Sequence, residues 1–325
     1  MNTGDLISVL KTVFSEPERR VVLHLTGPPG CGKTSIPTAV AEELGLPVMT
    51  LALPTCEAVD LRGLPQVIGG QTVWASPLPR TGRGLLLLDE ISSAPPDVQV
   101  AAHHLIWNER GSDMSLPSTY HIVLTGNRAS DKTLFRPMSA PLRNRLTVLS
   151  VEPDLTSWTS WAYTQGVHPS IIGFLRWRPE MLIAKDIPGE GGFPSPRAWM
   201  QISRIVGLSI SAGAEREMLT GTIGEGAAIE YGAYLRTARE LPSIQEMIDK
   251  PQKASVSKSP SVSYAVVSAL AMYTRREGVS AMPYVKRLPA EYAVMYLRDI
   301  RDRYDIRKDL DIREWVAKHS DLFDW

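Results

Sequence analysis

A nine-residue stretch, GPPGCGKTS at Gly27–Ser35, constrains this chain more than any other feature. It has the spacing G-x-x-x-x-G-K-[ST], follows the apolar run RVVLHLT and precedes the helix-forming run TSIPTAVAEELG. A strand before the loop and a helix after it suit phosphate binding, because glycines let backbone N–H groups point at phosphate oxygens and the helix dipole favours the same anion. The sequence therefore predicts a nucleotide-binding loop.

The whole stretch supplies the predicted cofactor-binding residues, and ATP and Mg²⁺ are the predicted cofactors. These residues are Gly27, Pro28, Pro29, Gly30, Cys31, Gly32, Lys33, Thr34 and Ser35. We expect Lys33 to reach the β- and γ-phosphates and the hydroxyl of Thr34 to ligate Mg²⁺.

A second stretch, GLLLLDE at Gly84–Glu90, reads as a buried strand that ends in two acids. We expect Asp89 to hold the Mg²⁺ shell from the side opposite Thr34, and Glu90 to polarise a water aimed at the γ-phosphate. The structural alternative is a pair of acids that only caps a strand. A kinase would not need the second acid, so the pair favours hydrolysis over phosphoryl transfer to a small acceptor.

Four further polar residues complete the candidate catalytic set. Asn127 ends the apolar run YHIVLTGN, where its side chain could reach the attacking water. Arg143 and Arg145, in APLRNRL, precede another strand and could serve a neighbouring subunit as an arginine finger. Arg197, in FPSPRAWMQI, begins a helix and could fold over the phosphates. The alternatives are turn formation by Asn127, and surface solvation or ion pairing of Arg143 and Arg145.

The order of apolar runs predicts the domain organisation. Five apolar runs separated by helical patterns indicate an α/β domain with a parallel sheet over residues 1–152, with a hairpin insert at 64–77. The rest reads as an all-helical lid at 153–249, a polar, flexible linker at 250–261 and a helical extension at 262–325. The predicted strands are RVVLHLT, LPVMTLAL, GLLLLDE, YHIVLTGN and RLTVLSV.

Charge and composition exclude several classes of protein. The 35 basic and 35 acidic residues cancel, which argues against a protein that coats nucleic acid but leaves a local basic groove open. Residues 274–325 hold 11 basic and 10 acidic side chains, which predicts a solvated helical face rather than a nucleic-acid arm. The presence of only two cysteines favours a reducing, cytoplasmic location. The sequence lacks an apolar run long enough to predict a signal peptide or a membrane-spanning helix. The six histidines lack metal-ligand spacing, so we expect each to be hydrogen-bonded or exposed.

Taken together, these stretches resemble AAA+ ATPases. GPPGCGKT resembles Walker A, LLLLDE Walker B, Asn127 sensor 1, Arg145 the arginine finger and Arg197 sensor 2. The likeness is greatest to the MoxR-like, dynein-related branch and covers residues 21–197. It is carried by CEAVDLRGLPQV, VWASPL, DEISSAPPDVQVA and FPSPRAW.

The resemblance implies a five-stranded sheet with a small helical lid, and a hexameric or similar ring with ATP between subunits. It also implies work on another macromolecule, often with a von Willebrand factor A-type partner, and a hairpin that faces the pore of the ring. The finger pattern holds two arginines, so Arg143 could take the role of Arg145. The predicted function is an Mg-ATP-dependent ATPase that forms a homo-oligomeric ring and, like a chaperone, remodels or activates a protein partner. The alternatives are a DNA-acting motor or loader, and an assembly scaffold in which ATP only sets the oligomeric state.

Overall fold

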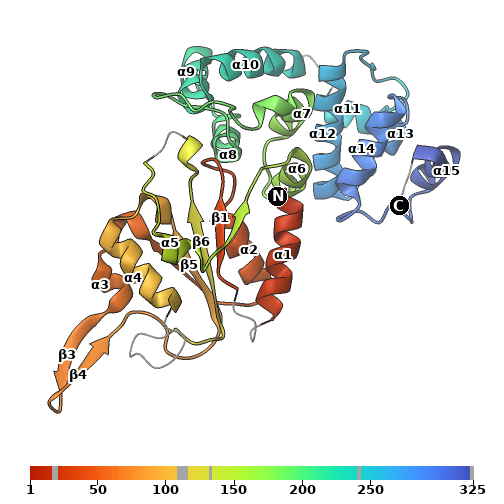
Figure 1. Ribbon diagram of the computed structural model, residues 1–325. Coiled ribbons are helices and arrows are strands. Elements are labelled where there is room, and N and C mark those ends of the chain that lie inside the picture. The colour runs from red at the N-terminus through yellow and green to blue at the C-terminus, as the bar shows by residue number, and fades with distance from the viewer. Residues whose placement is uncertain (17–20, 108–115, 132–133, 240–242, 323–325) are drawn as a thin grey trace. The chain divides into compact units, whose positions relative to one another are not determined.

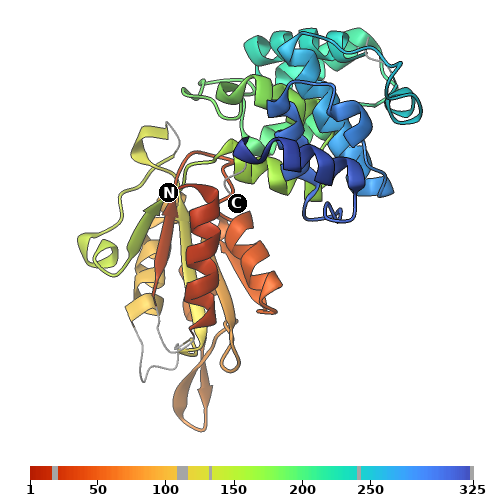
Figure 2. The ribbon, with the colours of Figure 1, turned by 90° about the vertical axis from the view of Figure 1, so that its right-hand side faces the viewer.

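The structure, a computed structural model, describes residues 1–16, 21–107, 116–131, 134–239 and 243–322 (Figures 1 and 2). The chain divides into two compact units, Met1–Asp154 and Leu155–Trp325.

A five-stranded parallel sheet forms the centre of the first unit, in the order β2-β5-β6-β1-β7. The observed fold class is therefore the predicted one, although all five strands are shorter than their apolar runs. The strands are β1 (Leu23–Thr26), β2 (Val48–Ala52), β5 (Gly84–Asp89), β6 (Tyr120–Gly126) and β7 (Thr147–Ser150).

Helices cover both faces of this sheet, and the alternation of side chains along each strand explains why. In β5, Leu85 and Leu87 pack with helices α1 and α2, whereas Leu86 and Leu88 pack with α3 and α4 on the opposite face. A continuous apolar run is what a strand buried on both faces requires. The helices of this unit are α1 (Thr3–Ser15), α2 (Ser35–Glu43), α3 (Ala58–Arg62), α4 (Pro96–Trp107) and α5 (Ala140–Arg143), with 3-10 turns η1 (Leu53–Thr55), η2 (Ile91–Ser93) and η3 (Ala129–Asp131).

The predicted hairpin is present as an antiparallel pair, β3 (Leu64–Ile68) and β4 (Gln71–Ala75), joined at Gly69 and Gly70. Its side chains are largely exposed, including those of Val67 and Ile68. That this hairpin faces a pore stays a prediction.

His24 occupies an unusual position in the middle of β1. Its neighbours Leu23 and Leu25 face α1 and α2, so the imidazole projects from the other face of the sheet, beside Gly126. It is 4% exposed, and neither ring nitrogen has a hydrogen-bond partner among the described residues. The expectation that every histidine is hydrogen-bonded or exposed is therefore wrong for His24. Burial lowers its pKa to about 4, which keeps the ring neutral at pH 7.

His24 is expected to make folding sensitive to mild acid. Because its pKa lies lower in the folded than in the unfolded state, the unfolded chain binds more protons between pH 6.5 and 4. This residue alone should reduce the free energy of unfolding by about 2 kcal/mol between about pH 7.5 and about pH 5. Urea unfolding of His24→Leu at both pH values should show that much less pH dependence, whereas the exposed His104→Leu should behave like the wild type. Equal pH dependence in wild type and His24→Leu would refute the assignment.

The described part of the second unit contains helices and no strand, as predicted. Several helices begin at a serine or aspartate whose side chain accepts a backbone N–H bond, as Ser195 does from Ala198. None of the described helices in either unit is long and apolar enough to cross a membrane. The helices are α6 (Leu155–Thr164), α7 (Pro169–Trp177), α8 (Pro196–Ile205), α9 (Ala212–Ile223), α10 (Glu225–Arg239), α11 (Ile244–Asp249), α12 (Pro260–Glu277), α13 (Met282–Val285), α14 (Ala290–Ile300) and α15 (Leu310–Lys318), with 3-10 turns η4 (Pro179–Met181) and η5 (Ser320–Leu322).

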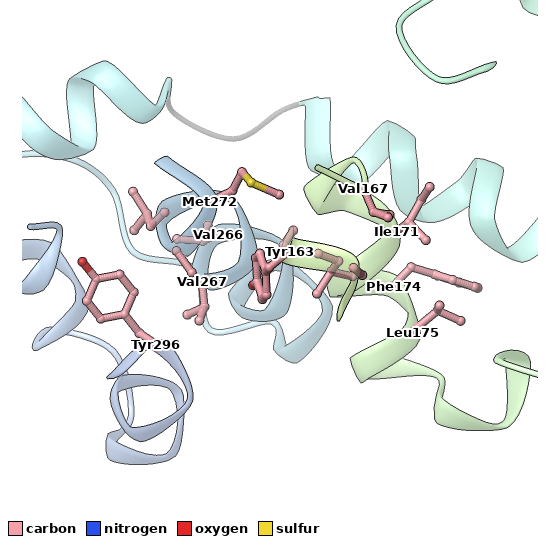
Figure 3. Packing of buried hydrophobic residues seen from close by; sticks show 14 of the residues in the cluster. Tyr163, Val167, Ile171, Phe174, Leu175, Val266, Val267, Met272 and Tyr296 are labelled. Carbon is pink, nitrogen blue, oxygen red and sulfur yellow. The ribbon is translucent and has the colours of Figure 1, made fainter. Parts of the chain in front are cut away.

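One hydrophobic core joins the helices on both sides of residues 250–261. Figure 3 shows Phe174 and Leu175 of α7 in the same cluster as Val266 of α12 and Tyr296 of α14. The segment between them, expected to be a flexible linker, is held in place: Ala254 is buried, and Tyr284 donates a hydrogen bond of 2.7 Å to the carbonyl of Ser255. The division into lid, linker and extension stays a prediction.

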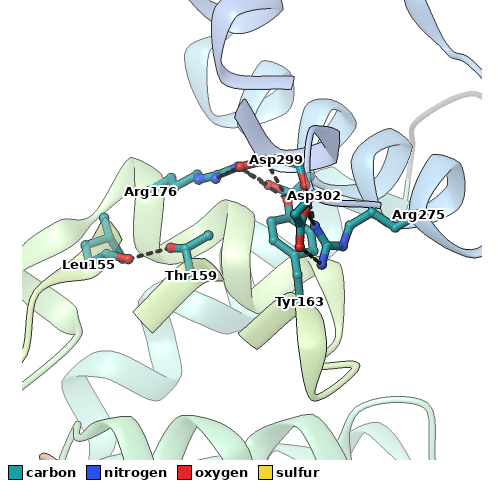
Figure 4. A network of polar contacts seen from close by, with 8 residues as sticks. Leu155, Thr159, Tyr163, Arg176, Arg275, Asp299 and Asp302 are labelled. Carbon is teal, nitrogen blue, oxygen red and sulfur yellow. Dashed lines mark hydrogen bonds and ion pairs between the residues drawn. The ribbon is translucent and has the colours of Figure 1, made fainter. Parts of the chain in front are cut away.

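A buried ion pair crosses this core (Figure 4). Arg176 of α7 donates two hydrogen bonds, of 2.5 and 2.6 Å, to the carboxylate of Asp299 on α14. Tyr163 of α6 donates a third, of 2.9 Å, and its pKa is raised by burial and by the neighbouring Asp299 carboxylate, so it remains a donor. The prediction that the charges after residue 274 form a solvated face is wrong for Asp299, which is 8% exposed. Its charge is stabilised by these three donors instead of by water.

Candidate functional site

The predicted phosphate loop connects β1 to the start of α2. At Gly27 a side chain would have its Cβ 2.5 Å from the carbonyl oxygen of Val151, so only glycine fits. Gly32 has φ of 97°, a conformation that other residues rarely adopt. The loop thus brings backbone amides to the N-terminus of α2, which is the arrangement that binds phosphate in other proteins.

Lys33 and Cys31 contribute to this loop in different ways. The ammonium group of Lys33 lies among oxygen atoms, donating to the carbonyls of Gly27 (2.7 Å) and Pro28 (2.9 Å) and to Oδ1 of Asn127 (3.0 Å). The thiol of Cys31 points into the core behind the loop, and burial raises its pKa. Cys31 can therefore face a ligand only through its backbone.

Residues from two strand ends meet beside the loop. Asp89 is the last residue of β5, and its Oδ1 accepts a hydrogen bond of 2.7 Å from the hydroxyl of Thr34. Asn127 follows the end of β6 and reaches Lys33, as described above. The carboxyl ends of the parallel strands therefore bring together four of the predicted site residues: Lys33, Thr34, Asp89 and Asn127.

Thr34 and Asp89 also suit the predicted metal ion. Mg²⁺ prefers oxygen ligands, and proteins commonly supply one or two of them while phosphates and waters supply the rest. The hydroxyl and carboxylate oxygens lie close enough to bind one ion together. Among the described residues there is no cluster of three or more His, Cys, Asp or Glu side chains that could hold a metal without such help.

Glu90 is the only non-glycine residue with a positive φ in the described part of the chain. Its φ of 60° and ψ of 44° lie in the left-handed region, which costs about 1–2 kcal/mol for a residue with a Cβ. The conformation ends β5 abruptly and begins η2, and it leaves the Glu90 side chain exposed. Backbone strain of this kind is concentrated at functional sites.

Two residues that the sequence analysis did not single out hold these elements. The hydroxyl of Thr125, in β6, contacts both Asp89 and the backbone N–H of Glu90. The hydroxyl of Ser92, in η2, accepts a hydrogen bond of 2.9 Å from the backbone N–H of Asn127. The sequence marks Thr125 only as a hydroxyl side chain within an apolar run, and Ser92 only as a hydroxyl side chain within a turn-forming run.

The structure distinguishes the two candidate arginine fingers. The guanidinium of Arg145 lies 3.7 Å from the centre of the Trp107 ring and donates to the carbonyl of Pro141 at 2.7 Å. Arg143 is exposed, and its side chain makes no hydrogen bond or ion pair with a described residue. Arg197 is also exposed, as the second residue of α8 in the second unit, so its position over the phosphates stays a prediction.

Residues 23–131 match the ATPase family associated with various cellular activities (AAA). The matched stretch holds the phosphate loop and strands β1, β2, β5 and β6, so this part of the chain has the sequence of an AAA ATPase domain.

Two curated relatives match part of the chain. Protein NorQ of Paracoccus denitrificans (strain Pd 1222) is 41% identical over 111 residues, which are 33% of this chain and 40% of that protein. The denitrification regulatory protein NirQ of Stutzerimonas stutzeri is 31% identical over 137 residues, which are 38% of this chain and 49% of that protein. The matched segments thus span less than half of either relative.

Among solved structures, the Thermotoga maritima RuvB Holliday junction branch migration motor covers 90% of this chain and 86% of its own. The identity is 17% and the TM-score 0.41, so this likeness carries no argument about function.

Proposed function

We propose that the protein is an Mg-ATP-dependent AAA+ ATPase of MoxR-like type that assembles into a ring and remodels or activates a protein partner. The observation that supports ATP hydrolysis most directly is the edge of the sheet where Lys33, Thr34, Asp89 and Asn127 meet, with the strained Glu90 beside them.

In the proposed reaction, the phosphate loop and Lys33 hold the triphosphate, and Thr34 and Asp89 hold Mg²⁺, which supplies charge neutralisation when bound. Glu90 orients a water molecule towards the γ-phosphorus. The water oxygen bonds to phosphorus, the bond to the bridging oxygen of ADP breaks, and the proton passes through Glu90 to solvent or product phosphate. Asn127 fixes the position of the water.

The names of the relatives support a regulatory role for this proposal. NirQ is described as a denitrification regulatory protein, and it is 31% identical to this chain over 137 residues. Regulation by an ATPase requires a partner that changes when ATP is hydrolysed. We propose a protein partner, such as one with a von Willebrand factor A-type domain, and a cytoplasmic homo-oligomer, with a hexamer as the expected ring.

The contacts of the two arginines lead to a test of ring assembly. The guanidinium of Arg143 has no hydrogen-bond or ion-pair partner among the described residues, whereas that of Arg145 contacts Trp107 and Pro141. We therefore expect Arg143 to reach the nucleotide of the neighbouring subunit. Arg143→Ala should lose ATP hydrolysis by about 10³-fold or more, whereas Arg145→Ala should lose much less. Steady-state phosphate release measures both.

Assemblies mixed from two variants show whether Arg143 acts on the nucleotide of a neighbouring subunit or on that of its own subunit. Arg143→Ala mixed with Glu90→Gln should recover activity, because some sites then combine an intact Glu90 with a neighbour's intact Arg143. Neither variant should be active alone. If the mixture does not recover ATP hydrolysis, or if the protein sediments as a monomer in the presence of ATP, the proposed ring is wrong.

A purified partner is needed to test remodelling. Affinity-tagged Glu90→Gln with ATP should retain a partner that the wild type releases, and the same partner should change its protease sensitivity only with wild-type protein and ATP. DNA-stimulated hydrolysis with steep salt dependence and no such partner would favour a DNA-acting motor instead.

A further inference from the structure

The hydroxyl of Thr125 lies between the two acids that end β5. Thr125 is fully buried, and its Oγ1 donates to Oδ1 of Asp89 while it accepts a hydrogen bond of 3.0 Å from the backbone N–H of Glu90. The hydroxyl of Thr34, at the end of the phosphate loop, donates to the same oxygen of Asp89. A single hydroxyl therefore connects β6 to both acids.

A hydroxyl is the group that this position requires. It is a donor and an acceptor at the same time, whereas a valine of the same shape is neither. Asp89 offers only acceptor oxygens when ionised, and the backbone of Glu90 offers only a donor here. Thr125 satisfies both, in a buried position where an unpaired N–H is unfavourable.

The conformation of Glu90 makes this contact important for its side chain. Glu90 is held in the left-handed region by two backbone hydrogen bonds: its N–H donates to the hydroxyl of Thr125, and its carbonyl accepts from the N–H of Ser93 at 2.9 Å. Without the first anchor, the residue could relax to an extended or helical conformation. The carboxylate would then point in a different direction, although the phosphate loop itself would be unchanged.

We propose that Thr125 is a positioning residue for ATP hydrolysis, which acts by holding Glu90 in its left-handed turn. This inference rests on the proposed ATPase function. It assigns Thr125 to catalysis and gives it little part in nucleotide affinity, because the hydrogen bonds of its hydroxyl join it to the two acids that end β5.

Thr125→Val tests this directly. We expect the maximal rate of phosphate release to fall on the order of 10- to 100-fold, as for misplacement of a reacting group, while the Kd for a fluorescent ATP analogue stays within about threefold. Thr125→Ser retains the hydroxyl and should recover most of the rate. Thr159→Val is the control, because Thr159 is also buried but its hydroxyl donates to the carbonyl of Leu155 in its own helix (Figure 4).

A double-substitution comparison shows whether the effect passes through Glu90. In single-turnover measurements, Thr125→Val should slow the residual hydrolysis of Glu90→Gln by less than about twofold, since the group it positions is already inactive. A full 10- to 100-fold further loss would overturn the inference, as would a Thr125→Val rate equal to that of wild type. If Thr125→Val does not fold, Thr125→Cys, a smaller perturbation with a weak donor, should give an intermediate rate, and a wild-type rate there would also overturn it. A wild-type chain that hydrolyses no ATP would instead refute the proposed function.

Discussion

Glu90→Gln is expected to bind ATP as tightly as the wild type and to hydrolyse it on the order of 10²–10⁴-fold more slowly. The amide cannot accept the proton of the attacking water, while the loop that holds the triphosphate is untouched. Phosphate release measures the rate, and a fluorescent ATP analogue measures the Kd. Lys33→Ala is the contrasting variant, since it should lose binding itself, and Lys11→Ala should change neither because Lys11 pairs with Glu43 on the surface.

The strain at Glu90 provides a second observable for the same residue. Glu90→Gly should be inactive but more stable by about 1 kcal/mol, because glycine adopts a φ of 60° without the cost of a Cβ. Glu90→Gln keeps that cost and should unfold like the wild type. A Glu90→Gln enzyme as fast as wild type would show that Glu90 is not the base. A Glu90→Gly protein less stable than the wild type would show that the left-handed conformation of Glu90 does not cost folding stability.

Asp299→Asn is expected to lower the free energy of unfolding of the second unit by about 3–5 kcal/mol. Arg176, whose guanidinium makes two bonds to Asp299, would keep a buried charge without its counter-ion. Urea unfolding followed by circular dichroism measures the loss. Because Asp299 lies on α14 and Arg176 on α7, the variant should loosen helices on both sides of residues 250–261, which hydrogen exchange can locate.

Asp311 offers a control in the same unit. It pairs with Lys286, and the two side chains are 40% and 36% exposed, so Asp311→Asn should cost less than about 1 kcal/mol. Replacing both members of the buried pair, as Arg176→Met with Asp299→Leu, should restore most of the stability. If Asp299→Asn is no more harmful than Asp311→Asn, the buried pair does not hold the second unit together.

Local sequence was sufficient to predict the sheet and the loop. Strands buried on both faces need long apolar runs, and a phosphate loop needs glycines at fixed spacing, so both leave a pattern within a few residues. Segments held in place by residues far away in the sequence were harder to predict. Residues 250–261 have the composition of a linker, yet Tyr284 and Arg287 hold their carbonyls. Their docking depends on helices formed later in the chain.

The sequence by itself determined the phosphate-loop pattern and predicted its ligand class, because Gly27–Ser35 and the paired acids Asp89 and Glu90 carry the spacing that phosphate and Mg²⁺ chemistry requires. Only the tertiary structure decided which side chains support them. Thr125 reaches the acids because β5 and β6 are neighbours in the sheet, and Asp299 is buried because α14 packs near α7. Hydrogen bonds between residues distant in sequence leave no local pattern, so the positioning of Glu90 became visible only in three dimensions.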